Sequence, residues 1–202
     1  MGPSEGHTVK VKGKIAQDNR THSYCPKCWS EAIRSYAVEG REYYRCERCG
    51  YDDSRLIMFY PQIRYRILPD SELLHYSVGA VIEWEGKVLL FHRRLFPFRY
   101  TIVAGHWDLD DETPETAVTR EIREEAGIEV SPEKPVFVET LEEPCRRGAD
   151  FHVWRLYRAT VDQNTATLSD EADIIGWYAP DEIRGLDLTI PTEHFLKKLG
   201  II

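Results

Sequence analysis

Several short apolar runs, separated by turn residues, follow residue 57 and are typical of β-strands. Two of them, 76–84 and 87–92, are joined by Glu85-Gly86, which predicts a β-hairpin. A short strand is predicted at 101–104, directly before an acidic segment. Further strands are predicted at 136–140, 151–161 and 174–178.

One segment has a helical period instead. Apolar residues recur there every fourth position, at Val118, Ile122 and Ala126. Thr113 suits the N-cap, Pro114 suits the first helical position, and Gly127 suits a left-handed stop. We therefore expect a helix over 114–126, with its apolar stripe buried.

The order of elements predicts an α/β fold with a mixed sheet between helical layers. Short helices at 180–184 and 191–199 complete it. We expect this domain to cover 57–202, after a small module at 21–56. Residues 1–20 contain little apolar material, so a flexible tail is expected there.

Composition limits the functional classes. The chain has 202 residues, enough for one domain of ordinary size and a short module. Its net charge of -8 argues against bulk nucleic-acid binding, which depends on Lys and Arg neutralising phosphates. No apolar run is long enough for a membrane span and no signal-peptide core is evident, so we expect a cytoplasmic protein without membrane contact.

Four of the five cysteines occur in two Cys-x-x-Cys pairs: Cys25, Cys28, Cys46 and Cys49. This spacing is typical of a four-cysteine zinc site, in which four thiolates close the coordination shell and make the Zn²⁺ structural. Two disulfides or a redox pair are the alternative, which a chain without a secretory signal disfavours. The fifth cysteine, Cys145, is expected to be a reduced thiol.

The segment between the two cysteine pairs predicts a hairpin, with strands at 35–38 and 41–44 around Glu39-Gly40. Together with the cysteines, it predicts a zinc ribbon over 21–56. Its acidic and basic residues balance in number, so we expect the ribbon to pack against protein or to form a homodimer rather than to bind nucleic acid.

The predicted helix carries three carboxylates on one face: Glu121, Glu124 and Glu125. Residues three and four apart on a helix are neighbours, so these like charges repel. Hard divalent cations take oxygen ligands, and a Mg²⁺ or Mn²⁺ ion would relieve the repulsion. A solvated acidic face is the alternative. However, these residues lie beside the apolar stripe, which favours a site at the edge of the core.

The segment from Gly105 to Ile128 resembles the Nudix box, in which a glycine and a glutamate precede Arg-Glu-aliphatic-x-Glu-Glu-x-Gly-aliphatic. Glu112 and Arg120–Ile128 match without a gap. Six residues separate Gly105 from Glu112 where the family has five, so the loop has one extra residue or His106 replaces the glycine.

This resemblance implies a Nudix fold and a group of catalytic residues. By resemblance, Glu121, Glu124 and Glu125 bind Mg²⁺, and the Gly105 carbonyl is a further metal contact. Arg120 orients these carboxylates and pairs with Glu112.

The resemblance also implies hydrolysis of a nucleoside diphosphate linked to another moiety, with ADP-ribose, NADH or a nucleoside triphosphate as the small-molecule substrate. A zinc ribbon before a Nudix domain is similar to the NADH pyrophosphatases. Their Ser-Gln-Pro-Trp-like array is absent here, where the corresponding stretch contains Glu143-Pro144-Cys145-Arg146-Arg147. A non-catalytic nucleotide-sensing or partner-binding module is the alternative.

Substrate contacts are predicted at the end of the second strand and in the loop after it. Arg93 and Arg94 offer planar forks to phosphate oxygens, or form an exposed basic strand end. The ring of Tyr100 can stack on a base or anchor the loop. Glu171 is a candidate general base or a solvated turn residue. His106 and His152 are expected to be packed, hydrogen-bonded histidines.

Overall fold

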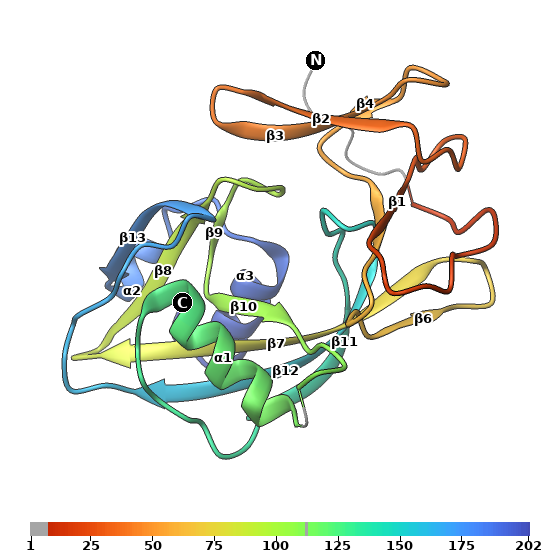
Figure 1. The fold of residues 1–202 in the computed structure, drawn as a ribbon. Coiled ribbons are helices and arrows are strands. Elements are labelled where there is room, and N and C mark those ends of the chain that lie inside the picture. The colour runs from red at the N-terminus through yellow and green to blue at the C-terminus, as the bar shows by residue number, and fades with distance from the viewer. Residues whose placement is uncertain (1–7, 112) are drawn as a thin grey trace.

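The computed structural model describes residues 8–111 and 113–202. Figure 1 shows a sheet with helix α1 in front of it and a separate hairpin, β2–β3, above it. The predicted fold class is confirmed: a mixed α/β domain follows a small module that contains the four paired cysteines.

The main sheet has the strand order β11-β12-β7-β8-β13. Strands β7 and β12 run parallel, and the other pairs on this path are antiparallel. Strands β6 and β10 also pair with β7, and β9 pairs with β8. The strands are β6 (Tyr65–Ile67), β7 (Leu73–Trp84), β8 (Lys87–Arg93), β9 (Tyr100–Thr101), β10 (Val103–His106), β11 (Phe137–Glu142), β12 (Phe151–Thr160) and β13 (Ala172–Tyr178).

Strands β7 and β8 pair only beside their turn, at Glu83↔Val88 and Trp84↔Lys87. Farther along, β7 pairs with β10 instead, and β8 pairs with β9. The predicted single strand over 101–104 is thus two short strands separated at Ile102, whose N–H donates to Thr192 Oγ1 at 3.1 Å. The divergence places β10 directly beneath helix α1.

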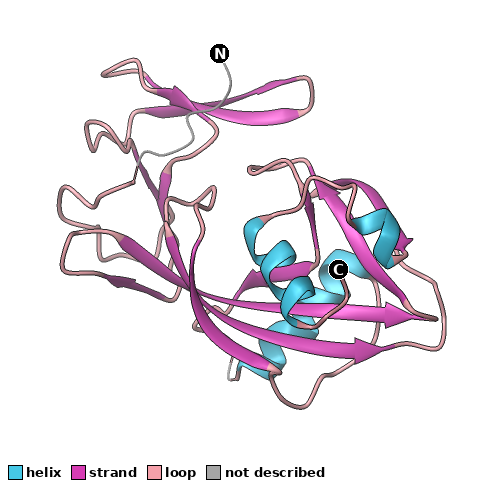
Figure 2. Ribbon diagram, turned by 180° about the vertical axis from the view of Figure 1, so that it is seen from behind, coloured by secondary structure: helices cyan, strands magenta, loops and turns pink. Residues whose placement is uncertain are grey.

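Alternate side chains of β7 reach opposite faces of the sheet, as a pleated strand requires. Val78, Ala80 and Ile82 belong to the core beneath α1 (Pro114–Ala126). Val81 belongs to a second core, which is covered by α2 (Pro180–Ile183) and α3 (Ile190–Lys198). Figure 2, seen from behind, shows the helices on both sides of the strands.

Helix α1 has the predicted boundaries. The Thr113 side chain accepts from Thr116 N, and the Thr116 side chain accepts from Thr113 N, both at 3.1 Å. Gly127 ends the helix in the left-handed region with φ 66°. Within the described ranges, no helix has the length and apolar character needed to cross a membrane.

The cysteine-rich module forms a three-stranded sheet in the order β2-β3-β4. Its strands are β2 (Ile33–Val38), β3 (Arg41–Cys46) and β4 (Asp52–Asp53). The predicted turn at Glu39-Gly40 is present, with φ values of 51° and 78°. A further pair, β1 (His22–Tyr24) with β5 (Ile57–Phe59), connects the module to the segment that enters the main domain.

The junction between the module and the main domain is buried. Arg55 donates to Asp150 Oδ1 at 2.6 Å, and both side chains are about nine-tenths buried. Asp150 Oδ2 accepts from Val9 N at 2.6 Å, and Val9 itself is buried. The predicted flexible tail, 1–20, is therefore anchored at Val9, while residues 1–7 lie outside the described residues.

Candidate active site

The three carboxylates of helix α1 lie at the edge of the core and differ in how deeply they are buried. Glu125 is buried, and its Oε2 accepts from Ala104 N in β10 at 2.8 Å. The Glu121 side chain is 12% exposed and that of Glu124 is 53% exposed. The solvated-face alternative is therefore wrong for two of the three residues, since Glu121 and Glu125 face the protein.

Gly105 lies directly against Glu121. A Cβ built at Gly105 would be 2.0 Å from Glu121 Oε1, which is far inside van der Waals contact. Only a residue without a side chain allows this approach of backbone to carboxylate. Of the two alignments left open by the sequence, the structure thus favours Gly105 as the required glycine, with the extra residue in the following loop.

Arg120 holds the acidic cluster together. Its guanidinium donates to both oxygens of Asp111, at 3.1 Å and 2.9 Å, and to Glu121 Oε1 at 2.7 Å. It also donates to Glu124 Oε2 at 3.2 Å and to the His106 carbonyl at 3.0 Å. The predicted partner, Glu112, lies outside the described residues. Asp111, which sequence reasoning did not select, forms a bidentate pair with Arg120.

Burial changes the acidity of the two inner carboxyl groups. It raises the pKa of Glu121 to about 7, although the Arg120 charge opposes the shift. Burial also raises the pKa of Glu125 well above its ordinary value, with a further contribution from the Glu121 charge. Two buried, mutually repelling carboxylates are costly as anions unless a cation joins them.

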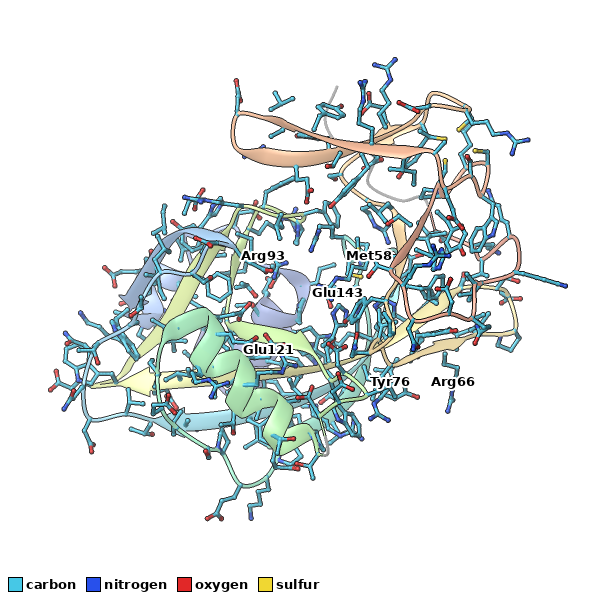
Figure 3. All side chains as sticks on the ribbon, in the orientation of Figure 1. Met58, Arg66, Tyr76, Arg93, Glu121 and Glu143 are labelled. Carbon is cyan, nitrogen blue, oxygen red and sulfur yellow. The ribbon has the colours of Figure 1, made fainter. Side chains whose placement is uncertain are left out.

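These groups line a cavity of about 290 Å³. It brings together most of the predicted site residues: Arg93, Gly105, Arg120, Glu121, Glu124, Glu125 and Glu171. Figure 3 labels Arg93, at the end of β8, Glu121, on α1, and Glu143, in the loop after β11, in the same part of the molecule. Glu171 is near enough for its charge to raise the pKa of both Glu121 and Glu125, in addition to the larger effect of burial.

The structure does not place Arg94 or Tyr100 among the cavity-lining residues. Arg94 N donates to the Glu171 carbonyl at 2.9 Å, so its backbone helps to position Glu171. Tyr100 packs edge-on against Tyr178, with ring centroids 5.7 Å apart. Its ring is thus a loop anchor, the alternative that the sequence left open.

The loop between β11 and β12 was missed as part of the site. Glu143, Cys145, Arg146 and Arg147 all line the cavity. The sequence signal was available, because this is the stretch that departs from the NADH pyrophosphatase pattern. Two adjacent arginines there supply positive charge opposite the acidic helix, which suits a phosphate-bearing ligand.

The four paired cysteines converge as predicted. Cys25 Sγ lies 3.6 Å from Cys49 Sγ, and Cys28 Sγ lies 3.6 Å from Cys46 Sγ. Disulfide sulfurs are about 2.05 Å apart, so these thiols are unbonded. Tetrahedral zinc with bonds of ~2.3 Å requires sulfurs about 3.8 Å apart, close to the observed spacing. The cluster fits a zinc ribbon.

The cysteine module also contacts the wall of the cavity. Arg146 donates to Tyr44 Oη at 2.9 Å and to Glu42 Oε2 at 3.3 Å, both on β3. The Tyr43 ring lies 6.2 Å from that of Phe98, in the loop after β8. Two cavity-forming loops therefore touch the same hairpin.

Comparisons with known proteins give a consistent result. A family model described as NUDIX domain matches residues 73–199, from the start of β7 to the residue after α3. The MutT-like protein of Streptomyces ambofaciens is 32% identical over 107 residues, which are 53% of this chain and 65% of that protein. The match thus spans a little under two thirds of the relative's length.

Solved structures are similar over the same region. The MutT NUDIX hydrolase of Burkholderia pseudomallei is 26% identical with a TM-score of 0.52, covering 61% of this chain and 96% of that one. The NUDIX domain of Shewanella oneidensis NrtR, complexed with ADP ribose, is 20% identical with a TM-score of 0.50, covering 61% of this chain and 84% of that one.

Proposed function

The chain belongs to the Nudix family, and we propose on that premise that it hydrolyses the pyrophosphate bond of a nucleoside diphosphate linked to another moiety. The observation that carries the proposal is the convergence of Glu121, Glu124 and Glu125 with the Gly105 backbone on one cavity. Arg93, Arg146 and Arg147 line the same cavity, and a lining that contains both carboxylates and guanidinium groups suits a metal-bound phosphate ester.

The donor set fits Mg²⁺ or Mn²⁺. Carboxylate and carbonyl oxygens are the ligands that these hard cations prefer. Glu121, Glu124 and Glu125 would hold the metal, with the Gly105 carbonyl as a further contact. When bound, the divalent cation supplies neutralisation of phosphate charge and a more acidic water.

The chain's own residues have distinct roles in this proposal. Arg120 positions the carboxylates through its bonds to Asp111 and Glu121. Arg93 offers its guanidinium to the phosphate oxygens from the opposite side. Glu171 accepts the proton of the attacking water, since it lies beside the carboxylates and on the cavity wall.

The substrate class follows from the cavity. Its lining is polar and contains both acidic and basic side chains, so it suits a nucleotide more than an apolar ligand. The Shewanella oneidensis relative is complexed with ADP ribose, which supports ADP-ribose as the first candidate, before NADH and nucleoside triphosphates.

The four cysteines would hold a structural Zn²⁺. A homodimer and a cytoplasmic location stay predictions.

The test is a magnesium-containing assay of ADP-ribose, NADH and nucleoside triphosphates, with product nucleotides separated by chromatography. We expect hydrolysis that is lost without the divalent metal. Glu124→Gln and Glu125→Gln should each abolish hydrolysis while the circular dichroism spectrum is retained.

Glu129→Gln is the matched control, because Glu129 is an exposed acid just beyond the helix. It should keep full activity. Full activity in both helix variants would overturn the assignment of the site. Binding of a nucleotide without any hydrolysis would support the alternative, a non-catalytic sensing module.

A further inference from the structure

A second group of metal-ligand residues lies beside the active cavity. It consists of His75, His106, Cys145 and His152, whose ligand atoms are all within 4.8 Å of one another. His106, Cys145 and His152 also line the cavity. None of these residues has a role in the proposed hydrolysis.

Sheet register places the three histidines together. His152 in β12 is the direct partner of His75 in the parallel β7–β12 pair. His106 in β10 is opposite Ser77, two residues from His75 and so on the same face of β7. The loop between β11 and β12 then returns Cys145 over this face, where its Sγ lies 3.9 Å from His75 Nδ1.

Two of the three histidines lie deep in the core. His75 is fully buried and His152 is 2% exposed. Among the described residues, neither His75 Nε2 nor His152 Nδ1 has a hydrogen-bond partner. These two nitrogens lie on the far side of each ring from the proposed ligand atoms, so the case for an ion rests on the distances between the nitrogen and sulfur atoms inside the cluster.

The spacing matches a coordination shell. Tetrahedral zinc, with bonds of about 2.0 Å to nitrogen and ~2.3 Å to sulfur, places its ligand atoms roughly 3.3–3.8 Å apart. His75 Nδ1 lies 3.1 Å from His106 Nε2 and 3.9 Å from Cys145 Sγ. We propose that His75, His106, Cys145 and His152 form a second metal site, occupied by zinc or a divalent ion of similar ligand preference.

Glu143 supports this assignment. Its Oε2 lies 3.6 Å from His152 Nδ1, just beyond hydrogen-bond distance, and accepts from Trp154 Nε1 at 3.1 Å. Metal-bound histidines commonly direct their second nitrogen to a carboxylate, which fixes the ring and makes it a stronger ligand. His152 would therefore bind through Nε2.

Binding of an ion to His106 requires a change in the hydrogen bond from Arg147. It donates to His106 Nδ1 at 2.6 Å, and arginine cannot accept, so the neutral ring carries its proton on Nε2. Binding through Nε2 requires that proton to move to Nδ1, and Arg147 then keeps its bond to Tyr60 Oη at 3.0 Å. The ion competes with Arg147 for His106.

Three imidazoles and a thiolate favour zinc over magnesium. Four protein ligands leave no open position, which is typical of a structural site. Its effect is to fix the loop that carries Arg146 and Arg147 to the cavity. The proposal does not depend on the hydrolytic function, because its test counts ions rather than turnover.

The experiment measures bound zinc in the 202-residue chain. Metal-free protein is incubated with excess zinc in the presence of a larger excess of magnesium, which occupies the carboxylate site, and unbound metal is then removed. We expect two zinc ions per chain by elemental analysis, against one for the four cysteines alone. Only one ion per chain in the wild type would overturn the proposal, whatever the variants do.

Single-residue variants test which side chains bind the second ion. Cys145→Ser and His152→Gln should each reduce the count from two to one, while His194→Gln should keep two. His194 is the matched control, because its 38%-exposed side chain pairs with Glu139 and packs against the Phe195 ring, away from the cluster. Two ions retained in both Cys145→Ser and His152→Gln would also overturn the assignment.

Cobalt gives an independent readout that does not depend on the folding of a variant. The second equivalent of Co²⁺ added to the wild type should develop the absorption of a tetrahedral, thiolate-bound ion, since ligand type and geometry determine the spectrum. A second equivalent with the weak spectrum of an octahedral aqua ion would contradict the site.

Discussion

The cysteine module and the active cavity use polar residues in opposite ways. In strands β2 and β3 of the module, only Tyr44 and Cys46 are buried, and Val38 is 49% exposed. The cavity is instead built on two continuous apolar cores on either side of the main sheet. The module thus depends on its thiolates for folding, whereas the cavity depends on a folded core to bring its charges together.

This difference separates two consequences of losing a metal. An ion bound by a module with little apolar packing around its hairpin contributes free energy of folding, of order 10 kcal/mol for small zinc domains. An ion bound by Glu121 and Glu125 relieves charge repulsion on a helix that packing already holds. We therefore expect loss of structure in the first case and loss of chemistry in the second.

The largest effect should follow zinc chelation. A strong chelator should unfold residues 33–46, because few apolar contacts remain to hold the β2–β3 hairpin. Hydrogen exchange measured by mass spectrometry should rise to the unfolded rate there, while 114–126 in helix α1 keeps its protection. Zinc added back should restore the hairpin. A hairpin that stays protected after chelation would show that it has enough packing of its own.

Gly105→Ala should instead reduce hydrolysis while the fold is retained. A Cβ at this position meets the Glu121 carboxylate at 2.0 Å, so the carboxylate must move. A displacement of about 1 Å can cost roughly 100-fold in rate, and we expect at least that loss of hydrolysis with little change in Tm. Gly185→Ala is the matched control, since its nearest contact would be an ordinary 3.6 Å. Equal activity of the two variants would contradict the role of Gly105.

The smallest effect should be at the junction between the two regions. Asp150→Asn leaves the buried Arg55 charge without its partner and weakens the bond to Val9 N. Loss of one partner of a buried pair costs on the order of 3 kcal/mol, so Tm should fall by several degrees. Asp181→Asn removes a 93%-exposed partner of Arg184 and should change Tm little. Similar Tm values for both variants would show that the junction is not coupled to global stability.

Local pattern was sufficient for helix α1, the two hairpin turns and the four-cysteine cluster. In each, the residues that determine the structure are close in sequence: caps at both helix ends, positive φ at Glu39-Gly40 and Glu85-Gly86, and paired cysteines. The three glutamates could be placed on one helical surface because neighbours three and four residues away are fixed by the helix itself.

The missed features depend on strand pairing between distant segments. His75 and His152 meet only because β7 and β12 are parallel neighbours in a particular register. A histidine inside an apolar run is by itself compatible with simple packing, so neither residue carried a distinctive signal. The place of Tyr100 outside the cavity lining depends on a similar long-range contact, since Ile102 N–H beside it bonds to Thr192 of α3.

Arg146 gives the module a thermodynamic connection to the cavity. The same guanidinium lines the cavity and bonds to Tyr44 and Glu42 of the hairpin. Coupling between two sites is reciprocal in free energy. An anion that orders Arg146 therefore makes the hairpin harder to open, and a loosened hairpin weakens anion binding by the same factor.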